Sequence, residues 1–501
     1  MKKIIITAMF MCFGLTSCKD FLTVVPETNL STAIFFTKEA DFQQAVNAAY
    51  VPLRAIVNDR AWLLGEMHSD NAYYYRNILF GATEQQEDIA DFAVPTANGV
   101  TSNVHVLNQY RLDYQIIARC NQVLAAIDKV EFGAESKNNL KGQASFLRAY
   151  AYFELVRYFG KVPMHLTPVT NRQEAAIALS EVEAIYTQII KDANAAITGL
   201  LPKSKQEPGR VTSGTARMLL ANVYMVRKNW GEAEKLLKEI VTSGEYKLMP
   251  DFNDAFSTNT GNKNNIESMF EVQFQEGASG YNGAIIYNYL PRPMSPEELK
   301  PITGTSNPQP LTGEGNGAPT PDLINAFEAG DKRKDATIGY VTIAGSLRAN
   351  KNFPYNKKFA KTHALHGNTG NNFPIYRYSE ALLFLAEALM EQGKGAEALP
   401  YLNQVRTRAG LPEATVTAQA DLRKQIYQDR RSELAFENKR WFDLVRTGTA
   451  VEVITAYGQR LKANPVDYYY PEGATARSHA FSNISLLYGL PADEAALSPH
   501  F

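Results

Sequence analysis

Residues 213–243, SGTARMLLANVYMVRKNWGEAEKLLKEIVTS, carry the pattern on which the predicted fold rests. Two stretches with apolar residues at helical intervals flank the short polar turn Lys228-Asn229-Trp230-Gly231. Apolar residues three and four positions apart lie on one face of a helix. The small residues Ala221 and Ala233 allow the two helices to approach closely. The segment therefore predicts a pair of helices that pack against each other.

The same pattern occurs again in residues 376–409, around the turn Gln392-Gly393-Lys394-Gly395. Five positions have identical spacing in the two stretches, namely Ala221, Tyr224, Ala233, Leu237 and Ile240 in the first and Ala386, Leu389, Ala398, Leu402 and Val405 in the second. This spacing resembles the tetratricopeptide repeat. A partial version lies in Gln143 to Phe159, with Ala149 and Tyr152 in the first-helix positions. Such units cannot bury their apolar faces alone, so we expect them to stack.

Helical patterns dominate both halves of the chain. Apart from the two repeats, they begin near Ser31 and cover about 105–130, 138–159, 181–199, 419–438 and 440–457. Residues 250–375 differ, because they are rich in Gly, Asn, Pro and Thr, and Glu271 to Gln275 alternates like a short strand. The Tyr and Phe content of this stretch argues against disorder. The predicted fold is mainly α, a tetratricopeptide-like helical-repeat scaffold with a loop-rich insertion at about 250–375 and a few short strands.

The N-terminus has the features of an exported protein. Met1-Lys2-Lys3 precedes an apolar run from Ile4 to Leu15, the pattern of a secretory signal. The run is shorter than the roughly 20 apolar residues that a spanning helix needs. It ends in Leu15-Thr16-Ser17-Cys18, which looks like the lipobox of bacterial lipoproteins. In such proteins the Cys is acylated after cleavage, and the acyl chains hold the protein on a membrane.

The sequence therefore predicts three segments, the second of which begins with the anchor residue. We expect a signal peptide at 1–17, a lipid anchor at Cys18, a tether at 18–33 and one helical domain over 34–501. Cys120 is then the one thiol of the mature chain besides the anchor, and its amphipathic surroundings predict a buried position.

Composition restricts the classes of partner. Lys and Arg number 51 against 52 Asp and Glu, a formal net charge of -1, which gives no electrostatic case for nucleic acid. The sequence contains no Gly-rich phosphate loop. We expect no cofactor and no metal, because His363 and His366 lie in an Asn- and Gly-rich stretch without a carboxylate at ligand spacing.

Four stretches together resemble the SusD/RagB family of outer-membrane nutrient-binding lipoproteins. In family order they are CKDFL at 18–22 followed by Pro26, LRAYAYFELVRYFGKVP at 147–163, RYSEALLFLAEA at 377–388 and RRSELAFENKRWFDLVR at 430–446. The resemblance implies a protein on the cell exterior that sits over a SusC-like TonB-dependent outer-membrane barrel. Family members capture oligosaccharide, or peptide in some branches, and pass it to that barrel.

The chain departs from the family pattern at two places. The family usually ends in a segment rich in Pro and Asn, whereas this chain closes with Ser498-Pro499-His500-Phe501. Where the family often has a Trp four residues before the equivalent of Tyr114, this chain has Tyr110, a smaller flat ring. We include Tyr110 among the candidate ligand-binding residues.

The strongest local candidates for ligand binding combine aromatic and polar side chains. Asp70 and Asn71 precede Tyr73, Tyr74 and Tyr75, and sugar rings pack on aromatic faces while their hydroxyls bond to polar groups. We expect this cluster on a loop at a helix end. A second group of candidates lies in the Gly-flanked part of the insertion, namely Tyr281, Tyr287 and Tyr289. The alternative is that these tyrosines fill space between helices.

The charged residues Glu433, Glu437, Arg440 and Asp443 recur at helical intervals, which predicts structural ion pairs along one helix face. No catalytic arrangement is visible, so we expect a binding protein that is not an enzyme. The leading hypothesis is a surface lipoprotein that delivers oligosaccharide to a SusC-like transporter. The alternatives are a peptide-binding member of the family, a helical-repeat scaffold without a small ligand, and a surface hydrolase.

Overall fold

The computed structural model describes residues 35–59, 62–76, 84–257, 262–313 and 315–500. A π-helical turn, Trp62–Met67, follows the first long helix. The α-helices are α3 (Glu39–Asp59), α4 (Glu84–Ala90), α5 (Val104–Ala126), α6 (Ala134–Phe159), α7 (Arg172–Ala175), α8 (Val182–Gly199), α9 (Ser213–Val226), α10 (Trp230–Thr242), α11 (Ile285–Asn288), α12 (Pro296–Thr303), α13 (Pro321–Ile324), α14 (Lys332–Thr337), α15 (Tyr378–Glu391), α16 (Gly395–Arg408), α17 (Gln419–Leu434), α18 (Arg440–Thr447), α19 (Ala450–Ala463) and α20 (Ala492–Ala495).

The strands are short and join in pairs. Antiparallel pairs form between β1 (Ala72–Tyr75) and β6 (Gly315–Pro319), β3 (Val162–Pro163) and β4 (Leu179–Ser180), β5 (Ser268–Val272) and β9 (Phe373–Arg377), and β7 (Ile338–Thr342) and β8 (Asn352–Asn356). A parallel pair joins β2 (Val100–Thr101) to β10 (Leu490–Pro491). The expectation of a mainly helical protein with a few short strands is confirmed.

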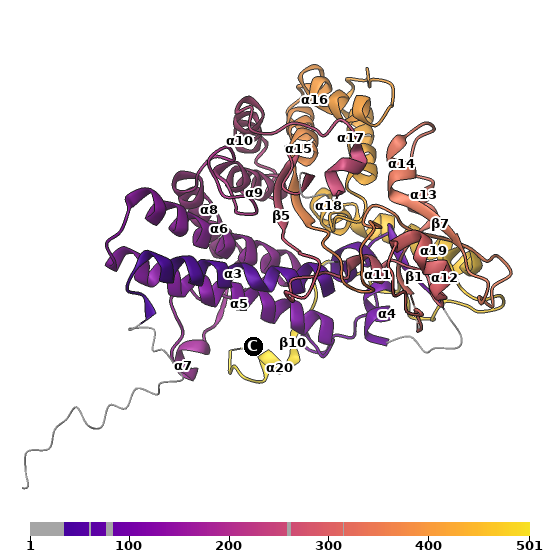
Figure 1. The fold of residues 1–501 in the computed structure, drawn as a ribbon, viewed down its shortest axis with the longest axis horizontal. Coiled ribbons are helices and arrows are strands. Elements are labelled where there is room, and N and C mark those ends of the chain that lie inside the picture. The colour runs from indigo at the N-terminus through magenta and orange to yellow at the C-terminus, as the bar shows by residue number, and fades with distance from the viewer. Residues whose placement is uncertain (1–34, 60–61, 77–83, 258–261, 314, 501) are drawn as a thin grey trace, which may run out of the picture.

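The helices stack in chain order. α3 packs on α5, α5 on α6, α6 on α8, α8 on α9, and α9 on α10. The stack then continues across the insertion, because α10 packs on α15, which in turn contacts α16 and α17. Figure 1 shows this course from the long purple helices to the orange ones above them. Each helix thus covers the apolar face of its neighbour, as stacked repeats require.

Both predicted helical hairpins form. α9 and α10 pack together, as do α15 and α16. The two hairpins are also tied at their turns, since the Glu234 carboxylate accepts hydrogen bonds from Gln392 Nε2 and Lys394 Nζ, each at 2.7 Å. These two charge-assisted bonds fix one repeat against the other.

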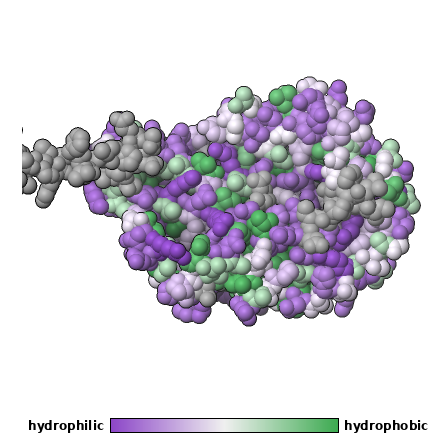
Figure 2. Space-filling view, turned by 90° about the horizontal axis from the view of Figure 1, so that it is seen from below, coloured by the Kyte–Doolittle hydropathy of each residue, from purple (hydrophilic) through white to green (hydrophobic). Residues whose placement is uncertain are grey.

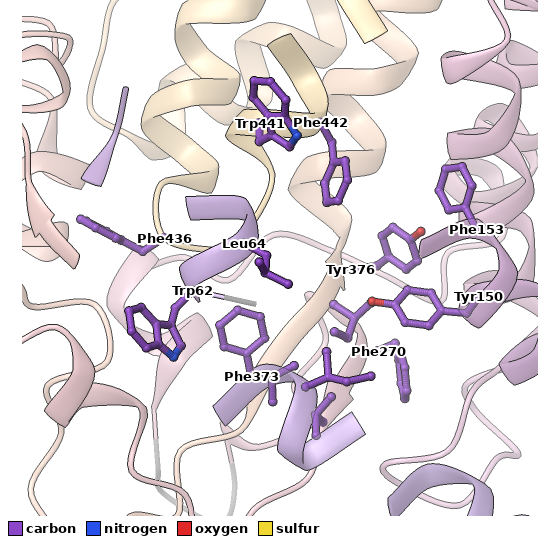
Figure 3. Close-up of a cluster of buried hydrophobic side chains, with 14 of the residues drawn as sticks. Trp62, Leu64, Tyr150, Phe153, Phe270, Phe373, Tyr376, Phe436, Trp441 and Phe442 are labelled. Carbon is purple, nitrogen blue, oxygen red and sulfur yellow. The ribbon is translucent and has the colours of Figure 1, made fainter. Parts of the chain in front are cut away.

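An aromatic core joins segments from both ends of the chain. Figure 3 shows Trp62 and Leu64 of the π-helical turn close to Phe373 of β9, with Trp441 and Phe442 of α18 above them. All five side chains are buried, as is Cys120, whose predicted buried position is confirmed. The core therefore binds the N-terminal helices to the C-terminal helices, across the insertion.

The insertion at about 250–375 is an integral part of the fold. A short strand was expected at Glu271 to Gln275, and β5 overlaps that stretch only at Glu271 and Val272. β5 pairs with β9 immediately before the second repeat. β6 pairs with β1 of the N-terminal half. The two ends of the insertion therefore pair with each other, and its middle pairs with the N-terminal half.

The charged residues of 430–446 form ion pairs, but the arrangement differs from the prediction. α17 ends at Leu434 and α18 begins at Arg440, so no single helix face carries them. Between the two helices, Phe436 and Asn438 adopt left-handed conformations, with φ 64° and 60°. Glu433 pairs instead with Arg377, at 2.9 Å. Pairing along one helix was therefore wrong, because the chain turns within the motif.

Several of these ion pairs are buried together and connect distant elements. Arg377 also pairs with Glu437 at 2.7 Å, and Lys358 reaches the same carboxylate at 2.8 Å. Burial acts to raise the pKa of Glu433, but the neighbouring arginines outweigh burial and hold that pKa well below its usual value. A network of this kind fixes a unique packing of β9 against the segment after α17.

In the described part of the chain, none of the helices is long and apolar enough to cross a membrane. No group of three or more His, Cys, Asp and Glu side chains in that part is arranged to hold a metal ion.

Candidate binding site at the C-terminal segment

The three consecutive tyrosines are core residues. Tyr73, Tyr74 and Tyr75 lie in β1, with their side chains 0–1% exposed, and not on a loop. Their hydroxyls are also occupied. Tyr73 Oη donates to Asp91 Oδ1 at 2.5 Å and lies 2.8 Å from the hydroxyl of Tyr470. A ring buried in this way presents no face to a ligand, so the expectation of a binding loop here is wrong.

Asp70 and Asn71 hold the same region together. The Asp70 carboxylate forms a two-pronged ion pair with Arg440, at 2.7 and 3.0 Å, and lies 2.9 Å from Arg431. Burial alone would raise the pKa of Asp70, but these two arginines lower it well below its usual value. Asn71 Nδ2 donates to Glu66 Oε1 at 3.0 Å. Both side chains are fully engaged within the protein, which corrects their assignment as ligand-binding residues.

The tyrosines of the insertion divide into two kinds. Tyr287 and Tyr289 are buried, and Tyr287 Oη lies 2.6 Å from His363 Nε2, so these two are also structural. Tyr281 is 50% exposed, and the guanidinium carbon of Arg54 lies 4.6 Å from its ring centre. The ring of Tyr281 is therefore accessible, as the prediction that it binds a ligand requires.

Tyr110 lies at an open pocket that the sequence did not predict. The pocket has a volume of about 480 Å³ and lies between α5, the chain after β3, α7 and the C-terminal segment. In Figure 1, α7 and α20 lie on the same, lower side of the molecule. The side chains that concern ligand binding are Tyr110, Tyr114, His165, Arg172, Glu494 and Leu497.

Aromatic rings form one side of this pocket. The ring centres of Tyr110 and Tyr114 are 4.7 Å apart, with their planes tilted by 44°. His165 meets Tyr114 edge to face, with ring centres 6.1 Å apart. The Tyr114 hydroxyl donates to the carbonyl of Pro163 at 2.6 Å, which fixes the ring against the end of β3. Tyr110 itself is only 4% exposed, whereas Tyr114 and His165 are half-buried.

The C-terminal segment forms the opposite wall. β10 pairs with β2, and the Tyr488 amide donates to the Tyr158 carbonyl at 2.8 Å. Beyond β10, Arg111 of α5 holds Glu494 of α20 at 2.6 Å. Leu497, 56% exposed, also lines the pocket. Strand pairing and an ion pair thus attach this wall to the rest of the protein. None of the residues of α20 is buried.

The pocket combines flat apolar surfaces with a few polar groups. Arg172 and Glu494 contribute opposite charges, and burial lowers the pKa of His165, which favours the neutral ring near pH 7. Figure 2 views the molecule from this side and shows apolar and polar residues intermingled on its surface. Such a mixture suits a ligand that has both apolar faces and hydroxyl groups.

Most residues of this candidate site could not be predicted from the sequence. Tyr110 and Tyr114 are four residues apart on a helix, a spacing that could have indicated a shared face. His165, Arg172 and Glu494 come from three other segments, and no local pattern relates them. The predicted anchor Cys18 and the tether at 18–33 lie outside the described residues.

Two family models match the chain. Residues 242–498 match the model described as SusD family. Residues 20–225 match a second model, described as starch-binding associating with outer membrane.

Individual relatives match nearly the whole chain. SusD-like protein P2 of Formosa agariphila is 27% identical over 501 aligned residues, which cover 93% of this chain and 94% of the relative. A solved SusD homolog from Bacteroides thetaiotaomicron has a TM-score of 0.74 at 20% identity, covering 95% of this chain and 98% of that one. A solved structure named a laminarin binding SusD-like protein has a TM-score of 0.73 at 24% identity, with 92% and 98% covered. Together with the four sequence motifs and the stacked helical repeats, these matches show that the chain belongs to the SusD/RagB family.

Proposed function

We propose that this protein is a lipid-anchored lipoprotein of the outer membrane, facing the cell exterior, that binds an oligosaccharide in the pocket beside the C-terminal segment. In this proposal it delivers the oligosaccharide to a SusC-like TonB-dependent transporter. The observation that carries the binding step is that Tyr114 and His165 line the same open cavity as Arg172 and Glu494. A starch-binding family model and a laminarin-binding structural relative support a glycan as the ligand.

The chemistry of the pocket fits a sugar chain. The axial C–H groups of a pyranose form an apolar face that packs on an aromatic ring, here Tyr114. The hydroxyls at the ring edge can bond to the carboxylate of Glu494 and the guanidinium of Arg172, both at the pocket wall. A few directed polar groups on an apolar surface give orientation and specificity. Tyr281, 50% exposed and outside this pocket, offers a separate aromatic surface to the same class of ligand.

Titration calorimetry against a panel of oligosaccharides and peptides tests the proposal. We expect glycan binding that Tyr114→Ala weakens about tenfold, the equivalent of losing roughly 1.4 kcal/mol of contact. Tyr114→Phe keeps the ring and should keep most of the affinity. Tyr340→Ala is the matched control, because Tyr340 is 52% exposed on β7 and does not line the pocket. Binding to peptides alone would overturn the carbohydrate assignment.

The anchor and the transporter need tests of their own. Replacing Cys18 with Ser should release the protein from the outer membrane, because acylation requires the thiol. The tether at 18–33 would then no longer hold the domain of residues 34–501 at the surface. A pull-down with the acylated protein should recover a TonB-dependent barrel. Recovery of the barrel, with no glycan or peptide bound by the protein in calorimetry, would favour a scaffold role instead.

A further inference from the structure

The charged side chains at the pocket differ in whether they have a partner of opposite charge. On the C-terminal wall, Glu494 is held by Arg111, with 2.6 Å between Arg111 Nε and Glu494 Oε1. Asp493 lies 3.9 Å from the same guanidinium. The acidic groups of this wall therefore already have a cation beside them.

Arg172, on the opposite wall, has no such partner. It is the first residue of α7, it is exposed, and it makes no side-chain hydrogen bond or ion pair among the described residues. Its guanidinium is therefore available to a ligand in the pocket.

The acid closest to Arg172 in the sequence is engaged elsewhere. The Glu174 carboxylate accepts hydrogen bonds from the amide and the hydroxyl of Thr170, at 2.7 and 2.9 Å, and from Asn171 Nδ2 at 2.8 Å. The Thr170 amide is the main reason that the pKa of Glu174 is lowered. Asn171 Oδ1 in turn accepts from the Glu174 amide at 3.0 Å, which caps α7. These bonds fix the loop and direct Glu174 away from the role of partner to Arg172.

We propose that Arg172 selects an acidic sugar unit, one that carries a carboxylate or a sulfate ester, in the pocket beside the C-terminal segment. This inference rests on the proposed function and names the class of glycan. A guanidinium presents donors in a planar fork that matches a carboxylate or sulfate group. The rings of Tyr114 and His165 lie in the same pocket, so one sugar unit can stack there while its acidic substituent reaches Arg172. The anion would supply the partner that Arg172 lacks.

Three tetrasaccharides of matched linkage test the inference by calorimetry. They are tetragalacturonate, its carboxyl-reduced neutral counterpart, and a sulfated form of the neutral one. We expect the wild-type protein to bind at least one acidic form about tenfold more tightly than the neutral form. The preference should shrink as salt is added, because an exposed ion pair is screened. Comparison of the two acidic forms tells a carboxylate site from a sulfate site.

Variants of Arg172 separate a specific contact from general charge. Arg172→Ala should make the acidic and neutral affinities equal, and Arg172→Lys should restore part of the preference. The control is Arg227→Ala, which also removes one exposed positive charge but from a residue that pairs with Glu183 outside the pocket.

The outcomes distinguish this inference from the proposed function. Equal wild-type affinity for the acidic and neutral forms, or an acidic preference that survives Arg172→Ala, would overturn the role of Arg172 and leave glycan binding in place. The same holds if none of the three binds while another glycan of the panel does. Failure to bind any glycan overturns both proposals.

Discussion

Asp70 and Arg440 form a two-pronged, partly buried ion pair, although 370 positions separate them in the sequence. The Asp70 side chain is 2% exposed and that of Arg440 14%. Arg431 adds a second cation at 2.9 Å. The contact joins the turn before β1 to the start of α18. It thereby connects the N-terminal half of the chain to the motif at 430–446. Asp70, predicted from the sequence to bind a ligand, therefore links two distant segments of the fold.

Replacing Asp70 with Asn should destabilise the protein by about 3–5 kcal/mol, because two arginines are left in a buried site without their counter-charge. Urea denaturation measures the change. The control is Asp128→Asn, which removes an exposed carboxylate that pairs with Lys141 at 2.6 Å. That change should cost less than about 1 kcal/mol. Equal losses in the two variants would contradict a special role for Asp70.

Gly65 is required by close contact with the turn after α17. A Cβ atom on Gly65 would lie 1.6 Å from Asn438 Oδ1. We expect Gly65→Ala to destabilise the fold by about 1–3 kcal/mol, as overpacking does. Adding Asn438→Gly should restore part of the loss, since glycine removes the clashing group and accepts the left-handed φ of 60°. Purely additive losses in the double variant would show that this contact is not the cause.

His68 should make stability depend on pH. Burial lowers the pKa of His68 to about 4 from 6.5, and its ring stacks on Phe92 with centres 4.0 Å apart. The folded state favours the neutral ring, so the stabilisation is complete above pH 6.5 and is lost as pH falls towards 4. The full shift is worth about 3 kcal/mol.

The comparison of wild type with His68→Leu between pH 7 and pH 4.5 measures this effect. Wild type should lose more unfolding free energy over this range than the variant. The comparison is needed because burial raises the pKa of Glu66 to about 7, and that group favours folding as pH falls. Its contribution is common to both proteins and cancels. Parallel pH profiles would rule His68 out as the source.

Deleting residues 492–501 should weaken glycan binding more than it weakens the fold. The deletion removes Glu494 and Leu497 from the pocket wall. None of the residues of α20 is buried, so little core packing is lost. We expect a fall in affinity of about tenfold in calorimetry, with a melting temperature within a few degrees of wild type. Unchanged affinity would place the ligand elsewhere, for instance at Tyr281.

The helical scaffold could be predicted from local sequence patterns. The hairpins around Asn229 and Lys394 follow from local information, because apolar spacing defines one face of each helix and a short polar turn reverses the chain. Such units must stack, so their packing could also be predicted. The short strand near Val272 and the buried position of Cys120 were likewise local in origin.

Which side chains are accessible depends on contacts between segments that are distant in the sequence. The local sequence pattern of an aromatic residue beside polar ones is the same whether the aromatic side chain faces solvent or the core. Here the pairing of β1 with β6 places Tyr73 inside the protein. The candidate pocket has the same origin, since Tyr110, His165, Arg172 and Glu494 lie on four separate segments. Contacts between residues so far apart in the chain depend on the packing of the whole domain. The sequence thus determined the helices, and their assembly determined where a ligand can bind.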